Sequence, residues 1–322
     1  MKLPRRIADI IKRKDDFITA REASLNKSVV RLQTMLISKL TREIIPMLDT
    51  SGGRIRNTLR NYQLLQSLDR VYKDFSTTQR LAFVSEIGDT ARGLTTLNKQ
   101  FFTVTMGASL PATFGRILAA TEKKMLMAIG VQGGKILNGG FLDSLSANTE
   151  LLTQIKNLMS QSVTSQVSTK DFISSMNELI TGAGEKPGGI ESHLNRFAHD
   201  LYMQYDSAYS TSLADETGMK YFIYLGGRIQ DSRDFCVALD GKVWSRAEAE
   251  KWREWTPAKG VYPPDYKIKQ KDKNAVPSYI AQFEGYQPLI HRGGFNCRHH
   301  LGWIMTELAE EMRPDLKKNI DK

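Results

Sequence analysis

The chain contains two cysteines, Cys236 and Cys297, and each lies in a block of residues that can bind metals or transfer protons. The first block reads Asp-Ser-Arg-Asp-Phe-Cys at 231–236 and Leu-Asp-Gly-Lys-Val-Trp at 239–244. The second block reads His-Arg-Gly-Gly-Phe-Asn-Cys-Arg-His-His at 291–300. Thiolates and imidazoles are side chains that bind zinc, which favours four such ligands in a tetrahedron. The two blocks together therefore carry the residue types of a metal site.

A zinc site is one hypothesis for these side chains. Cys297 and His299 lie two residues apart, so they would point the same way on a strand. Cys236 and His291 would arrive from other segments, and no close Cys-x-x-Cys or His-x3-His pair is present. The other hypothesis is that both cysteines are small buried hydrophobic residues that join the two blocks. We predict no cofactor and two reduced, neighbouring cysteines, with zinc at Cys236, His291, Cys297 and His299 as the alternative.

Enzymatic use of the same side chains is a third hypothesis. Cys236 and a histidine have the chemistry of a nucleophile and its base, but no family-specific signature surrounds this cysteine. His291, Asn296 and His300 match the letters of a nuclease motif, but their spacing leaves no room for the hairpin and helix of such a site. We therefore predict that the chain is not an enzyme. The alternative is a zinc-dependent or thiol-dependent hydrolase that uses the four possible zinc ligands.

The charged residues of the two blocks favour a structural role. A network of buried or half-buried ion pairs is expected among Asp231, Arg233, Asp234, Asp240 and Arg298. In this network Asp240 and Arg298 orient the two blocks against each other, and Trp244 and Trp303 pack nearby. The residues of the structural motif are Asp231, Arg233, Cys236, Asp240, Gly241, His291, Asn296, Cys297, Arg298 and His299.

Helical periodicity dominates the sequence that precedes the two blocks. One hydrophobic stripe at helical spacing consists of Val29, Leu32, Leu36, Leu40, Ile44 and Leu48. Ser51-Gly52-Gly53 is expected to end this helix. Ser76 and Gln79 have the spacing of a capping box, which predicts that a new helix begins there. Further helices are expected at 113–131, 148–159, 170–179 and 193–217.

The later part of the chain has a different texture. Gly182–Gly189 has the composition of a linker. Strands are expected at 221–225 and 242–244, a short helix at 246–254 with a capping box at Ser245 and Glu248, and a loop at 256–288. The sequence therefore predicts a mainly α fold, with an N-terminal helical region followed by a small α+β C-terminal module with long loops.

Length and charge limit the class of protein. The 322 residues suffice for about two domains of ~100–200 residues each. Lys and Arg number 45 against 35 Asp and Glu, a net charge of +10 that favours polyanionic partners such as DNA. No apolar run approaches the ~20 residues of a membrane span, so we expect no membrane partner. The candidate DNA contacts are Lys2, Arg5, Arg6, Lys12, Arg13, Lys14, Lys267, Lys269, Lys271 and Lys273.

The two blocks resemble the head morphogenesis, or minor head protein, family of tailed bacteriophages, whose C-terminal module is called the Mu F-like domain. Members of that family tend to carry an Asp/Arg-Cys block, a Leu-Asp-Gly-Lys-Val turn and a later block that ends in Asn-Cys-Arg. Many also have Cys-x-x-Cys in the first block and Cys-Arg-Cys in the last. Here Arg233 stands at the first of those cysteine positions and His299 at the final one.

The resemblance implies a structural protein of the virion. Its expected place is the phage head near the portal, after synthesis in the cytoplasm of a host bacterium. The implied partners are the portal protein, the major capsid or other head proteins, and phage double-stranded DNA bound without sequence preference. The implied domains are a helical region at 1–150 that docks on the portal or another copy, a Mu F-like module at 151–305, and a tail at 306–322. The implied role is head morphogenesis, with DNA packaging or ejection.

Overall fold

The computed structural model describes residues 4–133, 135–138, 149–184, 186–227, 232–254, 285–294 and 297–319. These residues are mainly helical with short antiparallel strands, which confirms the predicted fold class. The chain divides into two compact units. The helical unit comprises Ala20–Asp89 and Leu126–Ala198, and the sheet unit comprises Met1–Thr19, Thr90–Met125 and His199–Lys322. Each unit is built from segments that are separate in the sequence. The predicted domains 1–150, 151–305 and 306–322 are each continuous, and that division stays a prediction.

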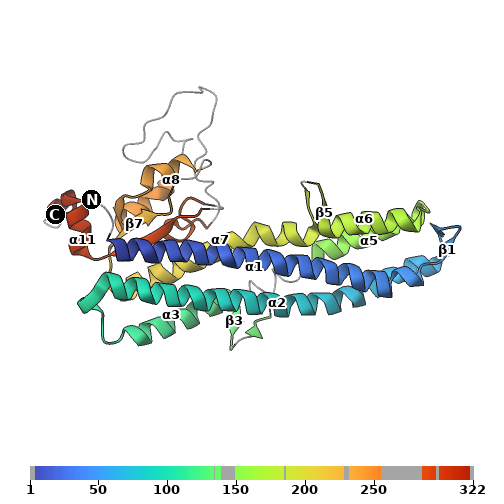
Figure 1. Cartoon of the computed structure of the whole chain (residues 1–322), viewed down its shortest axis with the longest axis horizontal. Helices are drawn as coiled ribbons and strands as arrows, with labels where there is room; N and C mark the ends of the chain where they lie inside the picture. Colours follow the sequence, from blue (N-terminus) through green and yellow to red (C-terminus); the bar gives the residue numbers. More distant parts are fainter. Residues whose placement is uncertain are drawn as a thin grey trace, which may run out of the picture. The chain divides into compact units, whose positions relative to one another are not determined.

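Long helices make up most of the described chain. The α-helices that precede the sheet are α1 (Arg5–Glu43), α2 (Leu59–Met106), α3 (Phe114–Ala128), α5 (Thr149–Thr164), α6 (Thr169–Thr181) and α7 (Gly189–Glu216). The predicted stripe from Val29 to Leu48 is buried along its whole length. Helix α1 ends at Glu43, before the predicted stop at Ser51-Gly52-Gly53, so that prediction is wrong, and Ile44 and Leu48 are buried on either side of the 3-10 turn Ile45–Met47. Helices α5 and α6 lie side by side in the helical unit (Figure 1). No helix in the described ranges has the length and apolarity to cross a membrane.

Three hairpins of identical register connect helices in the helical unit. They pair β1 (Thr50–Ser51) with β2 (Arg54–Ile55), β3 (Val131–Gln132) with β4 (Lys135–Ile136), and β5 (Gly182–Ala183) with β6 (Lys186–Pro187). Each has a two-residue turn, and Gly52 and Gly53 supply the positive φ angles of 57° and 75° that such a turn needs. The labels β1, β3 and β5 mark the hairpins in Figure 1. The prediction of a linker at Gly182–Gly189 is therefore wrong, since most of it forms a hairpin and α7 begins at Gly189.

The capping-box prediction at Ser76 and Gln79 is wrong. Helix α2 runs through both residues without a break, from Leu59 to Met106. Buried residues continue at helical spacing on both sides of this point, and the Gln79 side chain is itself fully buried. The packing of this long stripe overrides a local signal that elsewhere marks a helix start.

A three-stranded antiparallel sheet forms the centre of the sheet unit. The order is β8-β7-β9, with β7 at Tyr221–Leu225, β8 at Val243–Ser245 and β9 at His300–Ile304. Phe222 on β7 faces Trp244 on one neighbour and Trp303 on the other. Both tryptophans are buried, which confirms the prediction that they belong to the core.

Short helices surround this sheet. They are α8 (Asp234–Leu239), α9 (Arg246–Glu250), α10 (Pro288–His291), α11 (Thr306–Met312), and the 3-10 helices Lys251–Glu254 and Pro314–Asn319. A further 3-10 helix, Gly107–Ser109, follows α2. The predicted capping box of α9 is present, with Ser245 and Glu248 bonded reciprocally. Ala309 and Leu316 pack with Ile223 in one core cluster. Residues 306–319, predicted as a tail, are therefore part of the sheet unit.

Candidate metal centre

The two cysteines and one histidine meet in the interior of the sheet unit. The Sγ atoms of Cys236 and Cys297 lie 3.9 Å apart, and the Cys297 Sγ lies 3.8 Å from the His299 Nδ1. The three ligand atoms all lie within 4.8 Å of one another. Each of these residues is at most 4% exposed, and both cysteines are free thiols. The structure confirms the prediction that Cys236 and Cys297 are reduced neighbours, 61 positions apart in sequence.

Local backbone structure explains how each ligand reaches this point. Cys236 lies on the short helix α8, and Cys297 and His299 lie in the extended segment that leads into β9. Side chains alternate along extended backbone, so Cys297 and His299 point inward while Arg298, between them, is exposed. The prediction that Cys297 and His299 share one direction is confirmed. The ring of His299 stacks on that of Tyr224 from β7, with centroids 4.6 Å apart.

The two separations that involve the Cys297 sulfur fit a tetrahedral metal ion. Bonds of about 2.3 Å to sulfur and about 2.0 Å to nitrogen place two sulfurs about 3.8 Å apart, and a sulfur and a nitrogen about 3.6 Å apart. The observed separations of 3.9 Å and 3.8 Å are close to both values. Two thiols and an imidazole are also the donor set that zinc prefers. Cys236, Cys297 and His299 can therefore hold a metal ion.

Gly293 leaves space beside the two sulfurs. A Cβ atom at this position would lie 2.5 Å from the Cys236 Sγ and 3.1 Å from the Cys297 Sγ. Gly293 is not among the positive-φ glycines, so its backbone conformation would accept another residue. Glycine is required here for space, and the space it leaves adjoins both thiols.

His291 does not join the cluster, so the alternative of a zinc site with four ligands is wrong on this point. His291 ends α10, and its Nδ1 accepts a hydrogen bond from the Gln287 backbone N–H at 2.8 Å. Burial, followed by the nearby charge of Arg292, lowers the pKa of His291. The helical turn bends this side chain back onto its own backbone. Three of the four predicted zinc ligands therefore come together.

Hydrogen bonding between the thiols controls their ionisation. The contact with Cys297, together with burial, raises the pKa of Cys236. The same contact lowers the pKa of Cys297, as do hydrogen bonding to His299 and the charge of Arg292. Arg292 is itself buried, and its guanidinium donates to the carbonyl of Met203 at 2.9 Å and to the Ser207 hydroxyl.

The predicted ion pair of Asp240 and Arg298 is wrong. Arg298 is exposed, whereas the Asp240 carboxylate lies 3.8 Å from the Nε2 of His299. The alternation of side chains that buries His299 turns Arg298 outward, which is the physical reason. Asp240 still connects the two blocks, through the histidine. The adjacent Gly241 adopts φ +76° and donates its N–H to the Tyr224 carbonyl at 2.8 Å, so this glycine is required by the turn into β8.

The other predicted motif residues are dispersed or undescribed. Arg233 is half-buried just before α8, and its charge acts to lower the pKa of Cys236. Asp231 and Asn296 lie outside the described residues, and so does the side chain of Asp234.

A buried polar cluster beside α1 had no signal in the sequence. The Lys14 Nζ lies 3.0 Å from the Asp206 Oδ1 and donates to the Asn98 Oδ1 at 2.7 Å. The imidazole of His300 contacts Asp206 at 2.9 Å through Nδ1 and Asp15 at 2.6 Å through Nε2. Burial alone would raise the pKa of Asp206, but Lys14 and His300 hold it far below its usual range. The distinguishing feature of this cluster is a buried lysine with a carboxylate partner, and not the total charge of α1.

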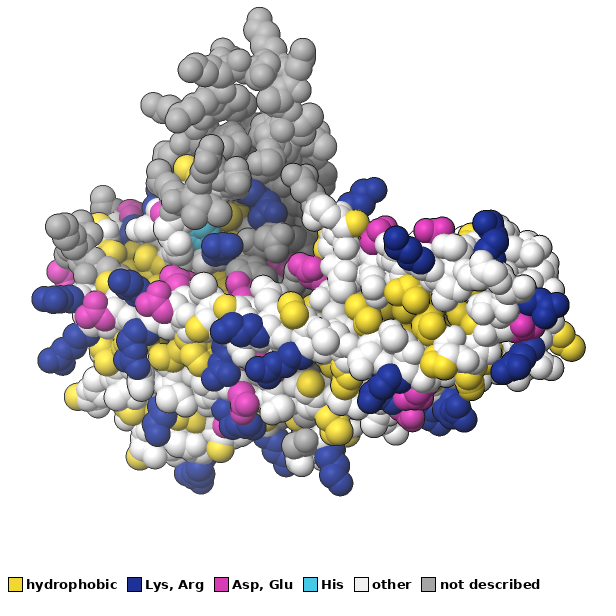
Figure 2. Space-filling model, turned by 45° about the vertical axis from the view of Figure 1, so that its right-hand side comes forward, with side chains coloured by type: hydrophobic (Ala, Val, Ile, Leu, Met, Phe, Trp, Pro, Cys, Tyr) yellow, Lys and Arg dark blue, Asp and Glu magenta, His cyan; other side chains and the backbone are white. Residues whose placement is uncertain are grey.

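Lys14 is wrong as a DNA-contact candidate, because its side chain is buried in this cluster. Arg5, Arg6, Lys12 and Arg13 are exposed on α1 and remain candidates. Lys2 and the four loop lysines Lys267, Lys269, Lys271 and Lys273 lie outside the described residues. Figure 2 shows Lys and Arg side chains spread over the face in view, with Asp and Glu among them.

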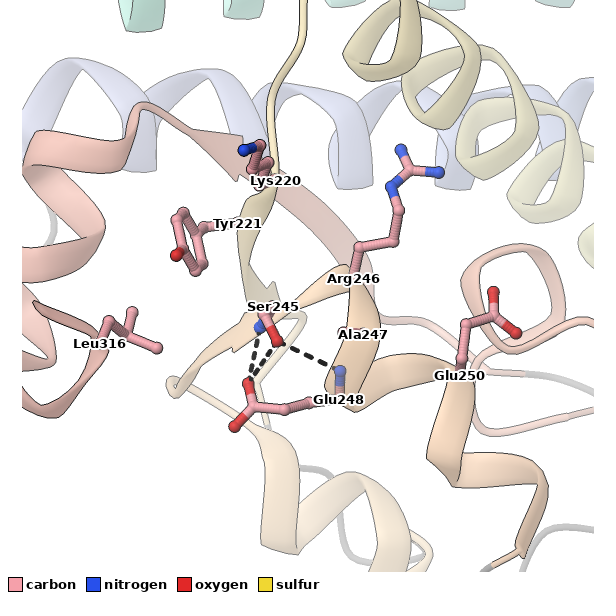
Figure 3. Close-up of a pocket in the computed structure, with 8 residues that line it drawn as sticks. All are labelled: Lys220, Tyr221, Ser245, Arg246, Ala247, Glu248, Glu250 and Leu316. Atoms are coloured by element: carbon pink, nitrogen blue, oxygen red, sulfur yellow. Dashed lines mark hydrogen bonds between the residues drawn. The ribbon is translucent and has the colours of Figure 1, made fainter. Parts of the chain in front are cut away.

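A pocket of about 640 Å³ lies in the sheet unit, and no residue of the cluster of Cys236, Cys297 and His299 lines it. Its lining consists of Lys220, Tyr221, Ser245, Arg246, Ala247, Glu248, Glu250 and Leu316 (Figure 3). The Ser245 hydroxyl and the Glu248 carboxylate bond to each other as the capping box of α9, and Arg313 also donates to Glu248 at 2.6 Å. Ser245 and Glu248 are therefore held in hydrogen bonds at the start of α9. No cysteine or histidine is among the lining residues.

Comparison with protein-family models, with curated proteins and with solved structures gives no match to this chain.

Proposed function

We propose that this protein is a structural minor head protein of a tailed bacteriophage, associated with the portal protein and the capsid interior. It assists head morphogenesis and DNA packaging or ejection. The supporting observation is the meeting of the two blocks that carry the family resemblance, with Cys236 and Cys297 at 3.9 Å. A resemblance based on isolated letters would place these segments at unrelated positions. Here they build one buried centre behind the sheet.

The proposal of a hydrolase has less support from the same geometry. A catalytic cysteine needs a low pKa and access for its substrate. Cys236 is 3% exposed, and its hydrogen bond with Cys297 together with burial raises the pKa of its thiol. Cys297, whose pKa is lowered, is 2% exposed. Three protein ligands would leave the fourth position of a zinc ion open, as in catalytic sites, but the burial of all three ligands favours a structural role.

We propose further that the cluster holds zinc, as a structural ion. Cys236, Cys297 and His299 supply two thiolates and an imidazole, and the bound ion would offset the charge of the two sulfurs. Zinc sites of this kind add the free energy of metal binding to the free energy of folding. The ion would join α8 to the segment before β9. In this role it would take the place of the second thiol pair that many members of the resembled family carry.

Double-stranded DNA is the proposed polyanionic partner. The exposed cations Arg5, Arg6, Lys12 and Arg13 and the net charge of +10 support it. Contacts to phosphates require no particular base sequence, which suits a protein that faces packaged DNA.

The decisive experiment removes the gene from a prophage that encodes it and restores wild-type or variant protein in trans. Heads are purified on a density gradient, and the protein is quantified by mass spectrometry in full and empty particles. We expect wild-type protein in the heads, and few full heads without it. Cys236→Ser and His299→Ala should lower both thermal stability and incorporation, because each removes a support of the buried centre.

The hydrolase makes the opposite prediction for these variants. Cys236→Ser and His299→Ala would then fold and enter particles normally, and would fail only at a chemical step. Arg298→Ala is the matched control, because this exposed neighbour of both ligands should change neither stability nor incorporation. Heads that assemble and fill normally without the gene product would contradict the proposed function.

A further inference from the structure

One tyrosine contacts all three candidate ligands. The Tyr224 hydroxyl lies 3.5 Å from the Cys236 Sγ and 3.4 Å from the Cys297 Sγ. The ring of Tyr224 stacks on the imidazole of His299 at a centroid distance of 4.6 Å and an interplanar angle of 20°. Tyr224 lies on the central strand β7 and is fully buried. Neither block includes this residue, so its place at the centre was not evident from the motif.

The two cysteine sulfurs offset the free-energy cost of burying the Tyr224 hydroxyl. A buried hydroxyl destabilises a fold unless it is hydrogen-bonded. Among the described residues, the hydrogen-bond partners of the Tyr224 hydroxyl are the two cysteine sulfurs. Phenylalanine would fill the same volume without this requirement. The hydroxyl is therefore best explained by what it does for the sulfurs.

We propose that Tyr224 is the positioning residue of the metal centre. This inference rests on the proposed zinc site. The hydroxyl donates a hydrogen bond to the metal-bound thiolates and offsets part of their negative charge, while the ring holds the imidazole so that Nδ1 faces the sulfurs. Partners of this kind around metal ligands orient them and tune the affinity for the ion. Tyr224 acts through the ligands and is not itself one of them.

Tyr221, three residues earlier on the same strand, provides a matched control. It is half-buried, lines the pocket of Figure 3, and lies outside the cluster. Tyr221→Phe and Tyr224→Phe each remove one hydroxyl from β7. Any effect of a lost hydroxyl on the strand itself is therefore present in both variants.

The test measures metal binding to the full-length protein. Zinc affinity is determined by competition with a chromophoric chelator, and cobalt(II) is used as a spectroscopic probe of the same site. For Tyr224→Phe we expect zinc affinity about 10–100-fold weaker than wild type, the range found for outer partners of metal ligands. We also expect the cobalt complex to stay tetrahedral, with its thiolate-to-metal absorption shifted to lower energy, because the sulfurs lose a hydrogen bond. Tyr221→Phe should match wild type in both measurements.

Several results would overturn the inference. Equal zinc affinity and an unshifted cobalt spectrum in Tyr224→Phe would show that the hydroxyl does not act on the sulfurs. Loss of the tetrahedral cobalt spectrum would show that the oxygen is a ligand. The unfolding midpoint in the presence of chelator is measured for each variant, so that a defect in the metal-free fold is recognised. Wild-type protein that binds neither metal would overturn the zinc site together with this inference, while its incorporation into heads would still test the proposed function.

Discussion

The helical unit and the sheet unit differ in what they bury. In the helical unit, the buried polar side chains of the described residues are neutral, and they are Gln33, Asn61, Gln79 and Ser162. Its ion pairs, such as Lys39 with Asp74 and Lys156 with Asp69, are partly exposed. The sheet unit buries titratable groups, which include Lys14, Asp206, Arg292, His299 and His300.

The two units therefore differ in whether their buried side chains only stabilise the fold or also fix its geometry. Hydrophobic stripes are enough to hold a bundle of helices, and they tolerate small changes in geometry. A buried charge is costly unless its partners lie at defined positions, so each one fixes the structure around it. The sheet unit carries such groups next to the cluster of Cys236, Cys297 and His299. We infer that the sheet unit is the part of the chain whose geometry is under functional constraint.

Removal of one carboxylate from each unit should show the largest difference between the units, measured as the loss in the free energy of unfolding. Asp206→Ala leaves Lys14 buried without its carboxylate, and we expect a loss of about 3–5 kcal/mol in the free energy of unfolding. Asp74→Ala in the helical unit removes the partner of Lys39 at a partly exposed site, and should cost only about 0–1 kcal/mol. The described tryptophans Trp244, Trp252 and Trp303 are buried in the sheet unit, so tryptophan fluorescence in a denaturant titration reports on that unit, and circular dichroism reports on both. Equal losses in the two variants would remove the distinction between the units.

A methyl group at Gly293 tests whether the space beside the sulfurs serves an ion. Gly293→Ala places a carbon about where the cluster would hold a metal, so zinc affinity should fall at least as far as with loss of an outer partner, about 10–100-fold. Gly115→Ala is the control, because a Cβ there meets open space within helix α3. Chelator competition gives the affinity, and calorimetry with and without zinc gives the stability. If Gly293→Ala binds zinc as tightly as wild type, any bound metal must lie away from the space beside the two sulfurs.

The smallest effect on stability is expected for the exposed cations of α1. Replacement of Arg5, Arg6, Lys12 and Arg13 by Ala should change the free energy of unfolding by no more than about 0.5 kcal/mol per site. If each cation neutralises one phosphate, the slope of log affinity for duplex DNA against log salt should become shallower by about 3.6. Fluorescence anisotropy with a labelled duplex measures that slope. Lys14→Ala should show the reverse pattern, with lost stability and an unchanged slope per molecule of folded protein.

Periodic and local signals were sufficient for much of the fold. The stripe from Val29 to Leu48, the aromatic strand Tyr221–Leu225 and the capping box of Ser245 and Glu248 are each specified by neighbours in sequence, and each is present. Local signals failed where longer-range packing decided the outcome. Ser76 and Gln79 lie inside α2 for this reason. The linker prediction at Gly182–Gly189 failed for another reason, because a local signal, Gly184 with positive φ in the two-residue turn between β5 and β6, indicates a hairpin.

The candidate site was predictable only in part, for a similar reason. The pairing of Cys236 with Cys297 follows from the two blocks, and the shared direction of Cys297 and His299 follows from alternation. The same alternation excludes Arg298 from the pair with Asp240, so that prediction could have been corrected from the sequence. The roles of Tyr224 and Asp206 depend on contacts between segments far apart in the chain, and no spacing in the sequence indicates them.

The link between Asp15 and His300 has a consequence for the order of events during synthesis. These residues are 285 positions apart and lie 2.6 Å from each other in the folded protein. At a translation rate of about 5–20 residues per second, Asp15 is made roughly 15–60 s before His300. For that time Asp15 has no histidine partner, whereas Asp206, the partner of Lys14, is made before His300. The helical unit, whose last residue is Ala198, has all of its sequence earlier. The nascent chain therefore passes through a stage in which one unit has its full sequence and the other waits for its final strand.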